Sequence, residues 1–217
     1  MKHIALLLIT MFVAAEAHAQ TRDDIFSETP ITWLGLDCSQ LKYINSKTKT
    51  DDTGDVSTPV LFYYFQKWSN MFVGPSERED MQKARLVATH GGQPGTEVTN
   101  KINYNSVKQH FSDKDNKRFR GNISEYQLLT EKQIASLVAK YDFNHKKGIG
   151  LLFFVEGMNK DKGETSMWVT FVNMSNKTVL LSKRITAPAG GNTVDDYWAK
   201  SFYNAMALVG EHMGEWQ

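Results

Sequence analysis

Three consecutive apolar runs near the carboxyl end constrain the fold of this 217-residue chain most strongly. Residues 148–160 read GIGLLFFVEGMNK, residues 165–174 read TSMWVTFVNM and residues 178–186 read TVLLSKRIT. Short polar segments connect them, as in strands that turn back on themselves. The first run is almost continuously apolar and the third alternates. We therefore predict an antiparallel meander whose first strand is buried on both faces and whose last strand lies nearer an edge.

Two helices are indicated beside this meander. After it, Thr193 and Asp196 form a capping pair, and apolar side chains then recur at steps of three and four residues: Trp198, Phe202, Ala205, Met206, Val209 and Met213. Before it, Thr130 and Gln133 form a capping box, followed by one apolar helix face of Ile134, Leu137, Val138 and Tyr141. Both patterns predict helices that pack on the sheet.

The first half of the chain is less regular. WLGLD at residues 33–37 predicts a buried strand, and Thr58-Pro59 predicts a helix start. The segment after it carries many aromatic side chains: Phe62, Tyr63, Tyr64, Phe65, Trp68 and Phe72. We interpret them as core, because they occupy several faces of the helix; a platform for stacking sugars is the alternative. The strand order of residues 75–125 stays open.

Together these elements predict an α/β fold of the α+β kind, with a single mixed sheet and helices packed on it. The three-strand antiparallel meander near the carboxyl end is closed by the long final helix. Neither side of the polar stretch at residues 44–59 is self-sufficient, so we expect a single α/β domain over residues 20–217.

The first nineteen residues have the pattern of a signal peptide. Lys2 precedes an apolar run from Ile4 to Ala15, and Ala17-His18-Ala19 matches the small-residue site at which such leaders are cut. The run is too short to span a membrane, and no later stretch is a candidate. We therefore expect cleavage after Ala19 and export, with the mature protein in a periplasm or secreted.

Composition excludes several classes of function. The formal net charge is +1, which offers no electrostatic footprint for nucleic acid or an anionic membrane. The single cysteine excludes an internal disulfide. We find no spacing typical of a metal site and no fingerprint of a cofactor, so we expect neither.

Asp37 and Glu156 are the candidate catalytic residues. Each follows an apolar run that we predict to be a central strand. If the two strands are neighbours running in the same direction, the carboxylates would meet at one end of the sheet, where open α/β folds place ligands. Such a pair can act as general acid and base, as in glycosidases. The alternative is that each carboxylate caps a strand or pairs with a lysine such as Lys160.

Two further features are weaker candidates for a reactive or ligand-binding site. Cys38 directly follows Asp37, whose charge would raise the pKa of the thiol, so we interpret it as a half-buried free thiol at the end of a strand. Residues 188–196, PAGGNTVDD, place two glycines before a helix, as phosphate sites do. Asp195 and Asp196 in the first turn would repel an anion, which favours a plain connection.

Four segments, WLGLD, GIGLLFFVEGMNK, MWVTFVNMSNKTVLLS and YWAKSFYNAM, together resemble an uncharacterised family of secreted bacterial proteins over roughly residues 31–209. The element order is also similar, in topology alone, to the amino-terminal domain of the Tol-system protein TolB and to curli-secretion lipoproteins. The resemblance implies an envelope protein and assigns no catalytic residue to any position.

We therefore expect an exported domain that is not an enzyme and that binds a partner, another protein of the cell envelope. A hydrolase acting on glycans through Asp37 and Glu156 is the competing hypothesis. A carrier of a small ligand that uses the aromatic helix is a third.

Overall fold

The computed structural model describes residues 20–27, 31–46, 64–65, 67–69, 72 and 120–217. The expected leader therefore lies outside the described residues, as does Thr58-Pro59. The elements, in chain order, are η1 Asp23–Phe26, β1 Ile31–Asp37, β2 Lys42–Ile44, β3 Arg120–Gly121, η3 Ile123–Glu125, α5 Glu131–Val138, β4 Ile149–Asn159, β5 Glu164–Asn173, β6 Thr178–Pro188, α6 Val194–His212 and η4 Met213–Trp216.

The described strands form one mixed sheet of six strands. Its order is β3-β2-β4-β5-β6, and β1 also pairs with β4. The β4–β5 and β5–β6 pairs are antiparallel, whereas β1 and β2 run parallel to β4. The predicted fold class and the meander are confirmed: every residue of β4 is buried, and β6 lies at one end of the described sheet.

The strands β1 and β2 occupy the same side of β4, one after the other. Ile31 to Asp37 align with Ile149 to Phe154, and Lys42 to Ile44 align with Gly157 to Asn159. Between them the backbone turns at Cys38, whose carbonyl accepts a hydrogen bond from the Leu41 amide at 3.1 Å. The WLGLDCS segment therefore ends one strand and leads into the next, and this second strand is an element that the sequence pattern did not indicate.

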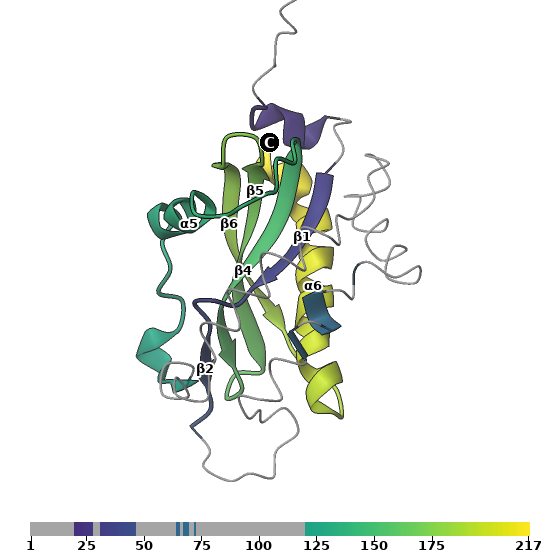
Figure 1. Ribbon diagram of the computed structural model, residues 1–217. Coiled ribbons are helices and arrows are strands. Elements are labelled where there is room, and N and C mark those ends of the chain that lie inside the picture. Colours follow the sequence, from purple (N-terminus) through teal and green to yellow (C-terminus); the bar gives the residue numbers. More distant parts are fainter. Residues whose placement is uncertain (1–19, 28–30, 47–63, 66, 70–71, 73–119) are drawn as a thin grey trace, which may run out of the picture.

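Helices cover both faces of the sheet, with α5 on one side and α6 on the other (Figure 1). The α5-side cluster contains Ile134 and Val138 of α5 with Phe154 and Trp168 of the strands. The larger α6-side cluster contains Trp198 and Phe202 of α6, with many residues of β1, β4 and β5. The strands β1, β4 and β5 supply both clusters because successive side chains point to opposite faces.

Both predicted helices are present with their caps. Thr130 and Gln133 form the capping box of α5, and the Thr193 side chain accepts a hydrogen bond from the Asp196 amide at the start of α6. One detail is wrong: α5 ends at Val138, so Tyr141 lies beyond the helix rather than on its face.

The aromatic segment is helical at residues 64–65 and 67–69, and Phe65, Trp68 and Phe72 are buried in the α6-side cluster. Trp68 donates a hydrogen bond of 2.9 Å to the Asp195 carboxylate near the start of α6. These contacts support the core interpretation over the sugar-stacking one. Among the helices formed by described residues, none is long and apolar enough to cross a membrane.

Candidate functional site

Asp37 and Glu156 lie on neighbouring parallel strands, as their predicted meeting requires. Asp37 ends β1 and aligns with Phe154, which is two residues before Glu156 on β4. The partners of both carboxylates belong to the side of the sheet that α5 covers: Tyr141 for Asp37 and Trp168 for Glu156. One part of the prediction is wrong, because Glu156 lies inside β4, which continues to Asn159, rather than after its end.

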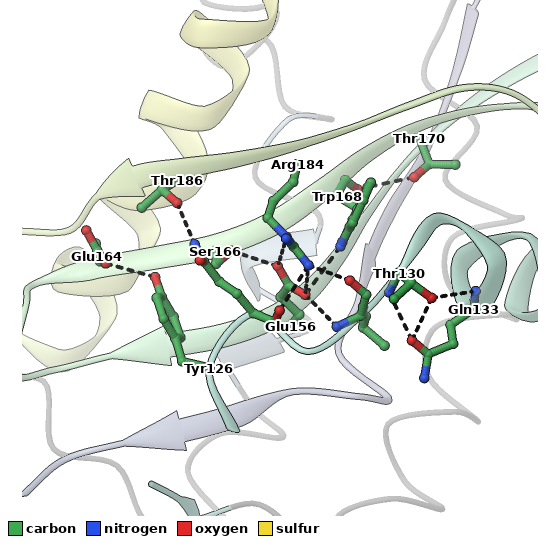
Figure 2. Close-up of polar contacts among 12 residues, drawn as sticks. Tyr126, Thr130, Gln133, Glu156, Glu164, Ser166, Trp168, Thr170, Arg184 and Thr186 are labelled. Atoms are coloured by element: carbon green, nitrogen blue, oxygen red, sulfur yellow. Dashed lines mark hydrogen bonds and ion pairs between the residues drawn. The ribbon is translucent and has the colours of Figure 1, made fainter. Parts of the chain in front are cut away.

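Glu156 is buried, with a side chain only 1% exposed, and it is surrounded by hydrogen-bond donors (Figure 2). One carboxylate oxygen accepts hydrogen bonds from the Ser166 hydroxyl at 2.8 Å and from Arg184 Nε at 2.7 Å. The other accepts from the Leu129 amide at 3.0 Å and from the Trp168 indole at 3.3 Å. A buried carboxylate is tolerated in a protein only when paired and hydrogen-bonded in this way.

Arg184 of β6 links this carboxylate to the segment that precedes α5. Its guanidinium lies 4.7 Å from the centre of the Trp168 ring, a cation–π contact. Its Nη2 donates to the carbonyl of Gln127 at 3.0 Å and to the carbonyl of Leu129. Arg184 therefore ties β4, β5 and β6 to residues 127–129, and we name Glu156, Ser166, Trp168, Arg184 and Leu129 the Glu156 network.

A β-bulge places Glu156 in this network. Val155 pairs with Met167 and Gly157 pairs with Ser166, so Glu156 is the extra residue on β4. Bulges redirect a side chain at the cost of one ladder position. Next to it, the Tyr126 ring lies over Gly157, and the Tyr126 hydroxyl donates to the Glu164 carboxylate at 3.1 Å. Partial burial and the Glu164 charge raise the pKa of Tyr126 above its usual range.

Replacement of Gly157 by alanine is expected to destabilise the fold by about 1–3 kcal/mol, the usual cost of overpacking. The added methyl would lie 2.5 Å from Cε2 of Tyr126, so the ring must leave its place beside the bulge. Urea denaturation measures the change. Gly214→Ala is the control, since nothing lies within 4 Å of a methyl there. Equal stability of both variants would show that the ring moves at no cost.

Asp37 is satisfied by a smaller set of donors. It is 2% exposed; one oxygen accepts from the Tyr141 hydroxyl and the other from the Ser39 amide at 2.8 Å. Burial and the Asp37 charge raise the pKa of Tyr141 well above its usual range, so the phenol remains a donor. Asp37 thus closes the turn after β1 and anchors the segment beyond α5.

Cys38 is fully buried rather than half-buried, in the α6-side cluster. Burial first, and the Asp37 charge second, raise the pKa of the thiol well above its usual range, as expected from the neighbouring carboxylate. Because the thiolate is the nucleophile, the burial of Cys38 and its raised pKa argue against a nucleophilic role for this thiol. Its role is packing.

The remaining sequence candidates form no further site within the described ranges. The glycine loop before α6 is a connection capped by Thr193, and Asp195 pairs with Lys67 and Trp68. No cluster of metal-binding side chains occurs among the residues that the structure describes.

The sequence analysis did not identify Arg184 as the partner of Glu156. The available signal was that a glutamate inside an apolar strand requires a cation or several donors.

No protein-family model, curated protein or solved structure matches this chain. The resemblance to secreted envelope proteins therefore stays a prediction.

Proposed function

We propose that this chain is an exported domain that performs no catalysis and binds another protein of the cell envelope. The observation that supports this proposal is that the carboxylate oxygens of Asp37 and Glu156 already accept hydrogen bonds from donors of the protein itself. A glycosidase needs one carboxyl group to give a proton and the other to attack or to activate water. Glu156 is instead paired with Arg184, and Asp37 accepts a hydrogen bond from Tyr141. These contacts hold the segments before and after α5 on the sheet.

The surface that we assign to the partner is the segment from Ile123 to Leu128. Ile123 is 57% exposed and Leu128 is 56% exposed, and these are the exposed large hydrophobic side chains of the described residues. Single exposed apolar residues are ordinary, but these two occur within six residues of the chain, so both can contribute to one contact. We call this segment the apolar segment.

The backbone of the apolar segment is held firmly on both sides of its exposed side chains. Gln127 and Leu129, which flank Leu128, accept hydrogen bonds from Arg184, and the Leu129 amide donates to Glu156. The turn of Ile123 is closed by the capping box of Asn122 and Glu125. A rigid backbone lowers the ordering cost of binding, so the Glu156 network serves to present Leu128.

The strand β6, which is the last strand of the described sheet, is a less suitable contact for the partner. A bulge at Leu180, an exposed Lys183 and Pro188 at its end are features that protect sheet edges from pairing with other chains. We therefore assign the contact to apolar side chains of the partner packed against Ile123 and Leu128, not to strand addition.

The test is the native mass of the mature protein, released from the envelope of its own cells after mild crosslinking. Wild type is expected to run as a heavy complex with one reproducible partner. Leu128→Glu and Ile123→Glu place a charge in the contact and are expected to weaken the complex about tenfold or more.

The matched control is Ala207→Glu, which adds the same charge at an exposed position of α6 on the other side of the sheet. All three variants alter exposed residues, so their unfolding midpoints are expected to match wild type. A free wild-type monomer would contradict the proposal as a whole. A complex that survives both glutamate variants would contradict the assigned surface.

A further inference from the structure

We infer that the amino terminus of the mature protein is a modification site, at which Gln20 closes on itself to form pyroglutamate. The inference rests on the export in the proposed function, because only cleavage after Ala19 makes Gln20 the first residue. Its second basis is the position of the Gln20 side chain, whose Nε2 lies beside Gly148 at the start of β4.

The fold is anchored from Thr21 onward. The Thr21 amide donates to the Asp24 carboxylate at 2.6 Å, and Arg22 donates to the carbonyl of Trp216 at 2.6 Å near the other end of the chain. Ile25 of η1 is fully buried in the α6-side cluster. The expected cleavage point thus leaves one residue, Gln20, before the first anchored residue, Thr21.

The carboxamide of Gln20 lies against the start of β4. A methyl at Gly148 would be 3.8 Å from Gln20 Nε2 and equally 3.8 Å from the Met174 methyl group. The carboxamide oxygen is buried and has no hydrogen-bond partner among the described residues. A buried polar atom without a partner is unfavourable, so the open side chain gains little from its position.

Cleavage would convert the backbone nitrogen of Gln20 into an α-amine, which can close on the carboxamide of the same residue through a five-membered ring. In this ring closure the neutral α-nitrogen of Gln20 bonds to Cδ, the Cδ–Nε2 bond breaks, and ammonia leaves with the transferred proton. No oxidant, reductant or co-reactant is needed, and the product is a neutral five-membered lactam.

The inference is tested by expressing the chain with its leader in a secreting host and measuring the intact mass and the amino-terminal peptide. We expect a chain that begins at residue 20 and is lighter by one ammonia. Its terminus should resist stepwise chemical degradation until pyroglutamyl aminopeptidase removes the ring.

The matched control is Gln20→Asn, which keeps the amide but would need a strained four-membered ring, so its terminus is expected to stay open. A chain that begins at residue 20 with a free amine in wild type would overturn the cyclisation and leave export intact. A chain that keeps its leader would overturn both. A processed chain that begins at another residue would overturn the cyclisation at Gln20 and leave export intact.

Discussion

Replacement of Glu156 by alanine is expected to lower the free energy of unfolding by about 3–5 kcal/mol, the range for breaking a buried ion pair. The change removes the acceptor of the Leu129 amide, the Ser166 hydroxyl and the Trp168 indole, and it leaves Arg184 without its anion. Each buried donor left without an acceptor adds a desolvation cost. Urea denaturation at neutral pH measures the change.

The control for this variant is Glu211→Ala, which alters an exposed glutamate of α6 and should leave stability nearly unchanged. A double variant separates the ion pair from the packing. Glu156→Leu combined with Arg184→Met removes both charges, so it is expected to be more stable than Glu156→Leu alone. An alanine variant as stable as wild type would contradict a structural role for Glu156 and would restore interest in its chemistry.

Stability is expected to fall as the pH rises above about 9, with a slope of at most about 1.4 kcal/mol per pH unit for each group that the unfolded chain deprotonates and the folded chain keeps protonated. The folded protein raises the pKa of Cys38 above the ordinary value of 9.0 and that of Tyr141 above 10.0, in both cases chiefly by burial. Above these ordinary values the unfolded chain loses protons that the folded chain retains. The stabilising contribution is therefore complete below pH 9 and is lost as the pH rises.

Unfolding curves at a series of alkaline pH values measure this loss, and two variants separate its steps. Cys38→Ala should remove the slope that begins near pH 9. Tyr141→Phe should reduce the further slope that begins near pH 10, to which Tyr126 also contributes because its pKa is raised as well. The slopes are compared rather than the absolute stabilities, because both variants also change packing. An unchanged slope in Cys38→Ala, or a thiol that reacts readily in the folded protein at pH 9, would contradict the burial of Cys38.

Local patterns were sufficient to predict the carboxyl-terminal half of the fold. The meander, the Thr130–Gln133 capping box and the Thr193 cap involve residues close together in the chain, where periodicity and hydrogen-bond chemistry act directly. The short strand β2 and the even shorter β3 were not predicted, since three residues and two residues carry too little periodicity to recognise.

The sequence identified the two carboxylates of the candidate site, but it did not predict which side chains contact them. Asp37 and Glu156 stood out as charges beside apolar runs, and the strands that carry them are neighbours. In the alternating segment TVLLSKRIT, Arg184 is one of two adjacent charges, and it lies 28 positions from the glutamate that it pairs with. No local pattern connects two residues at that separation.

The sequence by itself determined the class of this protein: one sheet, a meander, capped helices, and two carboxylates among apolar residues. Only the tertiary structure decided what those carboxylates do. The bulge at Glu156 and the break between β1 and β2 depend on the alignment of whole strands, which is set by packing on both faces of the sheet. That alignment supplied the donors that engage Asp37 and Glu156, because a charge buried by folding must find its partner from the rest of the chain.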